Sequence, residues 1–237
     1  MCFECVHVSR RRFMSFAATG AAAAGLWTMG GALSPSFAKT SLSADEALAK
    51  LKAGNQKFVS SPQLCAAELT NNRTAVAKGQ SPWATILTCA DSRVSPELIF
   101  GGVGLGELFV CRNAGNVADT AVMGTIEYGA EHLGSPLVVV MGHSRCGAVQ
   151  AACDVVEKDA KLPGSIKPMV DAIVPAAKAM KGKSGDFVDL SVRENARLNA
   201  EKVKAESDIV KELAHEGKVK IVYARYDLDT GVVDFLG

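Results

Sequence analysis

The sequence predicts an α/β fold, in which a mostly parallel β-sheet of four to five strands carries an antiparallel edge strand and is flanked by helices. Short, continuous apolar runs of the kind that form strands buried on both faces recur along the chain. Segments with helical spacing separate these runs, which requires crossover connections and therefore parallel pairing. Near the C-terminus, two apolar runs are joined only by a short turn, so the last strand is expected to pair antiparallel.

Two helices are predicted before the first strand. The first, in "SADEALAKLKAGNQKF", begins with Ser43 and Glu46 as a capping box, and the pair Gly54-Asn55 predicts its end. Its apolar residues fall on one face: Ala44, Ala47, Leu48 and Leu51. A second, more polar helix is predicted over 66–78.

Strands and helices then alternate to the C-terminus. Helical spacing is seen over 119–134, where Gly134 predicts the end, and again over 146–156, whereas 165–216 is helix-rich without any strand signal. The last two strands are predicted to form a hairpin around "DTG". The predicted strands cover 84–89, 107–112, 136–143, 218–228 and 232–236.

The first 38 residues have the organisation of an export signal. A basic stretch contains the pair Arg10-Arg11, a Gly/Ala-rich apolar run follows over 16–33, and a small-x-small pattern ends at Ala38. The arginine pair with Phe13 resembles a twin-arginine signal, although a plain secretory signal or a membrane anchor are alternatives. We therefore expect a signal over 1–38, a folded domain over 39–237, and a periplasmic or otherwise exported protein without a stable membrane anchor after cleavage.

Composition limits the possible partners and disulfides. The net charge of +1 and the 22% of charged residues give no indication of a nucleic-acid partner. Of the seven cysteines, Cys2 and Cys5 lie within the predicted signal, which leaves an odd number in the remaining chain. An odd number is unsuited to a disulfide framework, so a metal site is a reasonable alternative use of the thiols.

Candidate metal ligands follow two of the predicted strands. Cys89 ends the first strand, His143 ends the third, and Cys146 comes three residues later as a helix begins. The carboxyl ends of parallel strands share one sheet edge, so these residues are expected to meet. Two thiolates and one imidazole suit Zn²⁺ and leave a fourth position open. Asp91 is placed either to bind the metal or to stand beside a bound water, and Arg93 can hold its carboxylate.

These residues lie in motifs that resemble the β-class carbonic anhydrases: "CADSRV", "RNAGN", "IEYGAEHL" and "VMGHSRCGAV". The resemblance covers nearly all of the chain after the predicted signal. It implies reversible hydration of CO2 to bicarbonate and a proton, one zinc per chain, and a homodimer or larger homo-oligomer. It further implies Cys89, His143 and Cys146 as zinc ligands and Asp91-Arg93 as the catalytic dyad. In one family state Asp91 binds the metal, and in another it turns to Arg93.

Two other functions are compatible with parts of the same pattern. A hydrolase of carbonyl sulfide or carbon disulfide could use the same kind of zinc site, and the glycine-rich loop "GGVGLGE" over 101–107 keeps this alternative open. A non-catalytic zinc-binding or bicarbonate-binding protein would be expected to lack the dyad, yet Asp91 and Arg93 are both present.

Several other residues have plainer interpretations. Cys111 and Cys153 are expected to be buried apolar residues, and Cys65 a free thiol on a surface helix or its approach. His132 and His215 are expected at the surface. Tyr128 is expected in the core or at a dimer contact rather than in catalysis.

Overall fold

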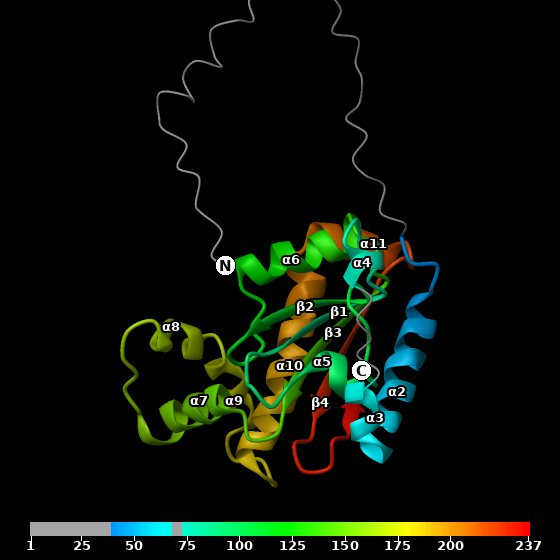
Figure 1. Cartoon of the computed structure of the whole chain (residues 1–237). Helices are drawn as coiled ribbons and strands as arrows, with labels where there is room; N and C mark the ends of the chain where they lie inside the picture. Colours follow the sequence, from blue (N-terminus) through cyan, green and yellow to red (C-terminus); the bar gives the residue numbers. More distant parts are fainter. Residues whose placement is uncertain (1–38, 68–72) are drawn as a thin grey trace, which may run out of the picture. The chain divides into compact units, whose positions relative to one another are not determined.

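The fold is described from a computed structural model that covers residues 39–67 and 73–237 (Figure 1). The predicted signal over 1–38 lies outside the described residues. Within the described part of the chain, none of the helices combines the length and the apolar character that crossing a membrane requires.

The sheet has five strands, and the predicted fold class is confirmed. Strands β1 to β4 pair in parallel and β5 pairs antiparallel to β4, in the spatial order β2-β1-β3-β4-β5. β1 and β3 are neighbours, and the chain leaves them toward opposite edges of the sheet, so a topological switch point lies between them. The strands are β1 (Ala84–Cys89), β2 (Leu108–Asn113), β3 (Leu137–His143), β4 (Lys220–Tyr226) and β5 (Val233–Phe235).

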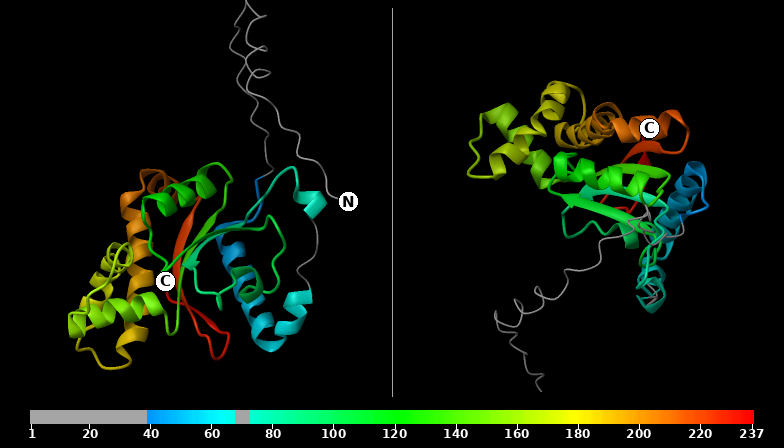
Figure 2. Two further views of the ribbon diagram at one scale, coloured as in Figure 1. Left: turned by 60° about the vertical axis from the view of Figure 1, so that its left-hand side comes forward. Right: turned by 90° about the horizontal axis from the view of Figure 1, so that it is seen from above.

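Helices cover both faces of the sheet, as Figure 2 shows for α2 on one side and α10 on the other. Successive residues of β3 enter two different clusters, because side chains alternate across a strand. Leu137, Val139 and Met141 pack in the cluster that includes α2, whereas Val138 and Val140 pack with α6 and α10. The helices are α2 (Ala44–Ser60), α3 (Pro62–Ala67), α4 (Arg73–Val76), α5 (Pro96–Ile99), α6 (Thr120–Glu131), α7 (Gly147–Lys158), α8 (Ile166–Asp171), α9 (Val174–Met180), α10 (Phe187–Glu206) and α11 (Asp208–His215).

Helix α2 begins as predicted but does not end at Gly54-Asn55, so that predicted end is wrong. Ser43 and Glu46 form the expected capping box, yet the helix continues to Ser60. A Cβ on Gly54 would lie 2.0 Å from the Phe100 carbonyl oxygen, so glycine allows a loop to approach the helix. The Asn55 amide donates to the carbonyls of Ile99 and Gly231 and accepts from Val233. Both residues therefore serve packing against distant segments rather than termination.

One residue prediction is also corrected, and another is narrowed to one of its alternatives. Cys65 lies in α3, but it is buried rather than at the surface, because α3 packs so tightly that a Cβ on Gly102 would lie 2.3 Å from the Cys65 carbonyl oxygen. Tyr128 is 46% exposed, which excludes the core alternative and leaves the dimer contact as a prediction. The predicted helix over 66–78 corresponds to the end of α3 and to α4, with 68–72 outside the described residues.

Candidate metal centre

Three potential metal ligands meet at the switch point of the sheet. Cys89 is the last residue of β1, His143 is the last residue of β3, and Cys146 is the N-cap of α7. Their donor atoms all lie within 4.8 Å of one another, and all three residues are buried. The sequence prediction that these residues come together at one sheet edge is confirmed.

His143 is oriented as a metal ligand would be. Its Nδ1 lies 3.0 Å from the Ser144 carbonyl oxygen, which can only accept, so Nδ1 carries the proton and donates. Nε2 is then left with a free lone pair, and it is buried without a hydrogen-bond partner. A buried polar atom without a partner is costly, and a metal ion held here would satisfy it.

The two thiols provide the other donors. Cys89 Sγ and Cys146 Sγ are 3.9 Å apart, and both cysteines are free. The hydrogen bond between them lowers the pKa of the Cys89 thiol, whereas the same hydrogen bond, together with burial, raises the pKa of Cys146. Two thiolates this close can both form when a cation lies between them, so the donor set fits Zn²⁺.

The Cys89 thiol also has a peptide donor. The backbone N–H of Gly115 donates to Cys89 Sγ over 3.4 Å. Arg112 holds the adjacent backbone, since its Nε donates to the Cys89 carbonyl over 3.0 Å and its Nη2 donates to the Asp91 carbonyl over 2.7 Å. The turn from Cys89 to Asp91 is thereby fixed on the end of β1.

Asp91 lies next to this group but is paired with Arg93. Arg93 donates from Nε to Oδ1 over 2.9 Å and from Nη2 to Oδ2 over 2.6 Å. These hydrogen bonds hold the pKa of the Asp91 carboxyl well below its usual range. Asp91 Oδ2 is 3.8 Å from His143 Nε2, so the carboxylate borders the metal position. Asp91 as a metal ligand stays a prediction, because in this structure it is bound to Arg93.

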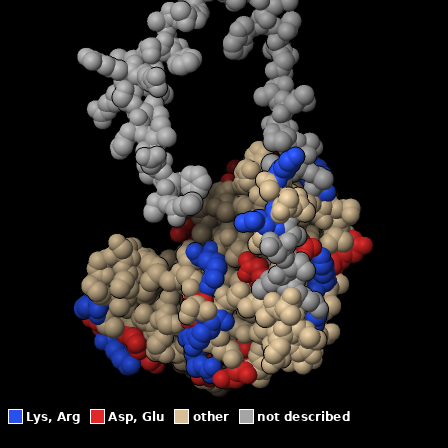
Figure 3. Space-filling model, viewed as in Figure 1, with Lys and Arg blue, Asp and Glu red and all other residues tan. Residues whose placement is uncertain are grey.

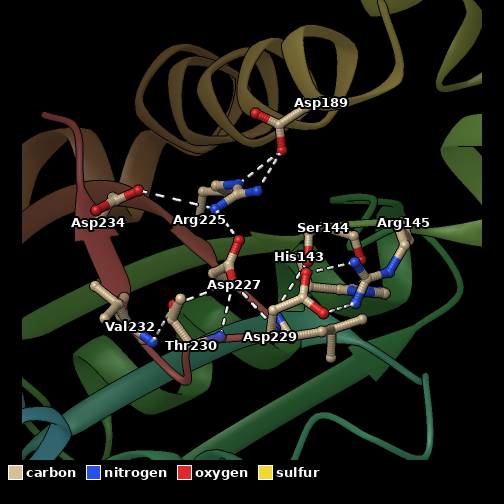
Figure 4. A network of polar contacts seen from close by, with 12 residues as sticks. His143, Ser144, Arg145, Asp189, Arg225, Asp227, Asp229, Thr230, Val232 and Asp234 are labelled. Carbon is tan, nitrogen blue, oxygen red and sulfur yellow. Dashed lines mark hydrogen bonds and ion pairs between the residues drawn. The ribbon is translucent and has the colours of Figure 1, made fainter. Parts of the chain in front are cut away.

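The turn between β4 and β5 contacts the two residues that separate the candidate ligands His143 and Cys146 (Figure 4). The Ser144 N–H donates to the Tyr226 carbonyl over 2.9 Å, and the Leu228 N–H donates to Ser144 Oγ over 2.9 Å. Arg145 pairs with Asp229 through two hydrogen bonds. The sequence predicted the hairpin but not this contact, for which no local signal exists.

Asp227 shapes that turn. Its Oδ1 accepts the backbone N–H groups of Asp229 and Thr230 over 3.0 and 2.9 Å, and its Oδ2 accepts from Arg225 over 2.7 Å. The hydrogen bond from the Thr230 backbone is the largest of the effects that lower the pKa of Asp227 to about 2. Arg225 also contacts Asp189 of α10, so the turn is tied to that helix as well.

The remaining predicted residues lie away from this group of ligands. His132 and His215 are exposed, and Cys111 and Cys153 are buried, as expected. Burial raises the pKa of the Cys111 thiol to about 11, which is typical of an unreactive core cysteine. Figure 3 shows basic and acidic side chains intermingled over the face in view, in keeping with the net charge of +1.

Known proteins share this sequence and fold. A family model described as carbonic anhydrase matches residues 84–233, which include all five candidate site residues. Carbonic anhydrase 2 of Mycobacterium tuberculosis (strain H37Rv) is 38% identical over 182 residues, covering 76% of this chain and 87% of that protein. The carbonic anhydrase of Mycolicibacterium smegmatis is 32% identical over 184 residues, covering 78% of this chain and 89% of that protein.

Solved structures agree with these matches. The Coccomyxa β-carbonic anhydrase in complex with acetazolamide superimposes with a TM-score of 0.63 and 31% identity, covering 80% of this chain and 86% of that one. The β-carbonic anhydrase CafA of Aspergillus fumigatus superimposes with a TM-score of 0.61 and 28% identity, covering 81% of this chain and 89% of that one.

Proposed function

The chain belongs to the β-class carbonic anhydrases, zinc enzymes that hydrate CO2 reversibly to bicarbonate and a proton, and we propose how its own residues carry this reaction. Cys89, His143 and Cys146 hold the zinc. The observation that carries this assignment is the buried, unpartnered Nε2 of His143 within 4.8 Å of two free thiols. When bound, zinc supplies the Lewis acid that makes a water molecule nucleophilic near neutral pH.

Asp91 and Arg93 are the proposed catalytic dyad. The Asp91 carboxylate is ionised and borders the metal position, so it can accept a hydrogen bond from the attacking water and orient it. Arg93 keeps that carboxylate charged and fixes both of its oxygens. Because a carboxylate held in this way is a poor base, its role is orientation rather than removal of a proton.

Apolar side chains keep the surroundings of the two thiols dry. Val117, Val149 and Ile173 pack in the same buried cluster as Cys89 and Cys146. A neutral, small substrate such as CO2 needs no charged contact to enter an apolar site. This lining also keeps water from competing for the thiolates.

A metal assay combined with stopped-flow CO2 hydration tests these assignments. Protein that begins at Lys39 is expected to hold about one zinc per chain and to hydrate CO2, whereas variants of the three ligands should lose zinc. Full zinc content in Cys89→Ser, His143→Ala and Cys146→Ser would overturn the ligand assignment. Full activity of Asp91→Ala would overturn the dyad.

We further propose export by the twin-arginine route, with a signal over 1–38 and a mature protein in the periplasm. The support is the order of the Arg10-Arg11 pair, the apolar run over 16–33 and the small residues before Lys39. Fractionation of cells that produce the chain is expected to recover a form beginning at Lys39 outside the cytoplasm. Replacing Arg10 and Arg11 by lysine should retain the protein inside, and unchanged export would exclude this route.

A homodimer or larger homo-oligomer is proposed as the working form. β2 is an edge strand. The ring of its Phe109 lies 6.1 Å from that of Tyr128, and the Tyr128 ring lies 5.1 Å from that of His132, in tilted arrangements. Tyr128 is 46% exposed. Exposed aromatic rings of this kind are enriched in interfaces. Sedimentation of the native enzyme should show an oligomer, and Tyr128→Ser should weaken its assembly. A monomeric native enzyme would exclude the proposed oligomer.

A further inference from the structure

Two buried asparagines on α10 are hydrogen-bonded to the segment that contacts Cys89, although neither is a candidate ligand. Asn195 is 1% exposed and Asn199 is 6% exposed, one helical turn apart. Burying an amide side chain costs free energy unless its polar atoms are hydrogen-bonded. The identity of their partners therefore indicates what these asparagines are for.

Their hydrogen bonds form one continuous chain. Asn199 Oδ1 accepts the Ala118 N–H over 2.7 Å, and Asn199 Nδ2 donates to Asn195 Oδ1 over 3.1 Å. Asn195 Nδ2 in turn donates to the Gly115 carbonyl over 2.8 Å. Both ends of the turn over 115–118 are thus tied to α10, a helix some 80 residues further along the chain.

The same turn contacts the metal centre directly. Gly115 carries the N–H that donates to Cys89 Sγ, and its φ of 79° belongs to the left-handed region that favours glycine. A Cβ on Gly115 would lie 2.4 Å from Ile173 Cδ1, so the turn is also enclosed by the segment that joins α8 and α9. The position of the Gly115 N–H is therefore set by packing on one side and by Asn195 on the other.

Helix α10 comes this close because of a glycine next to His143. A Cβ on Gly142 would lie 2.8 Å from Val192 Cγ1 and 3.2 Å from the Val192 carbonyl oxygen. Asn195 is one turn further along the same helix. The helix, the turn over 115–118 and the end of β3 therefore pack as one unit around Cys89.

We propose that Asn195 is a positioning residue of the metal centre, which keeps the Gly115 N–H on the Cys89 thiolate. The proposal rests on the assignment of Cys89 as a ligand. An N–H aimed at a ligand sulfur fixes the position of that sulfur, in the way that other hydrogen bonds orient metal ligands. Partners of this kind that hold a ligand in place tune metal affinity without touching the metal.

The test uses Asn195→Leu, which keeps the size of the side chain and removes its hydrogen bonds. Zinc affinity of the full-length enzyme is measured by competition with a chelator, and the thiolate-to-metal charge-transfer band is recorded after substitution by Co²⁺. Affinity is expected to fall about 10- to 100-fold, with a shifted band. Should this variant not fold, Asn195→Ala, which only removes atoms, replaces it in both measurements.

Ser191→Ala is the matched control on the same helix. Ser191 is fully buried, and the hydrogen bonds of its hydroxyl run to Phe187 and Cys153 rather than to the turn over 115–118. The Ser191→Ala variant should have a lower melting temperature, with zinc affinity and the cobalt band unchanged. A folded Asn195 variant that behaves like this control would overturn the proposal.

Cys89→Ser separates this proposal from the one on which it rests. If Cys89 is a ligand, this variant changes the cobalt band whatever Asn195 does. An unchanged band in Cys89→Ser would refute the ligand assignment itself and the positioning role with it. A changed band in Cys89→Ser, together with native affinity in Asn195→Leu, would refute the positioning role alone.

Discussion

Arg93 donates hydrogen bonds to both carboxylate oxygens of Asp91, and the same carboxylate borders the candidate metal centre, with its Oδ2 3.8 Å from His143 Nε2. The pair is asymmetric in its surroundings, because the Arg93 side chain is 52% exposed and that of Asp91 is 17% exposed. Arg93 can therefore be displaced toward solvent more easily than Asp91 can leave the site. The orientation of the carboxylate thus depends on a residue at the mouth of the site.

Removing the charge of Asp91 should slow CO2 hydration without removing the metal. Asp91→Asn keeps the shape of the side chain, but its amide cannot accept hydrogen bonds at both positions. We expect the rate constant for CO2 hydration to fall by about 100-fold or more, with zinc content unchanged. Stopped-flow hydration and metal analysis on the same preparation measure both quantities.

Asp159→Asn is the control for that substitution. Its side chain is 85% exposed and pairs with Lys161, and its φ of 51° is well tolerated by asparagine. It should keep full activity. A similar loss in both variants would show that the effect of Asp91→Asn is not specific to the site.

Arg93→Lys tests whether two-point contact is required. Lysine retains the positive charge but offers a compact ammonium that cannot hold both carboxylate oxygens in one plane. Activity is expected to fall about tenfold or more, with the native fold retained by circular dichroism. The control is Lys183→Arg, in the connection between α9 and α10, which exchanges the same two residue types in the opposite direction. It should leave the rate of CO2 hydration unchanged. Native activity of Arg93→Lys would mean that charge alone is sufficient.

Metal removal should expose the thiols to oxidation. Because Cys89 Sγ and Cys146 Sγ are only 3.9 Å apart, metal-free protein treated with a mild oxidant is expected to lose these two free thiols together. Zinc-loaded protein should keep them, and activity should return to the metal-free form only if zinc is added before the oxidant. Thiol titration with peptide mapping measures the outcome. Equal oxidation of the buried Cys111 would contradict it.

The sequence predicted the strands and the meeting of Cys89 and His143 at one sheet edge well, for physical reasons that are local. Continuous apolar runs such as 84–89 and 136–143 need burial on both faces, which leaves few places for them besides the centre of a sheet. Cys89 and His143 end these runs, so the parallel topology alone brings them to one edge.

The supporting contacts could not be predicted, because they join distant parts of the chain. Ser144 meets Leu228 across 84 positions, and Asn195 meets Gly115 across 80. In neither pair does the sequence around one residue indicate its contact with the other. The prediction for Gly54 is wrong for the same reason, since its partner is the Phe100 backbone rather than a helix end.

Acid should weaken the stabilising contribution that Asp227 makes in the β4–β5 turn. The hydrogen bonds to its carboxylate lower its pKa to about 2 in the folded protein, against an ordinary value of 3.8. The charged carboxylate therefore stabilises the fold above about pH 4, and this contribution is lost as the pH falls toward about 2. Asp227→Ala should lower the melting temperature at pH 7, and its difference from the native protein should shrink over that range. A difference that stays constant from pH 7 to 2 would contradict this role of the Asp227 carboxylate.

Two glycine-to-alanine substitutions in helices should have opposite effects on stability. Gly54 lies in the middle of α2, where a new Cβ would lie 2.0 Å from the Phe100 carbonyl oxygen and 2.6 Å from its carbon. Since backbone atoms cannot move aside as a flexible side chain can, Gly54→Ala is expected to cost about 1–3 kcal/mol of unfolding free energy. In α6, Gly124 has no atom within 4 Å of a new Cβ, so Gly124→Ala should gain about 0.5–1 kcal/mol from helix propensity. Denaturant unfolding of both variants measures the two changes. Equal stabilisation by both would show that α2 does not pack on the loop at Phe100, and close packing could then not explain the glycine at position 54.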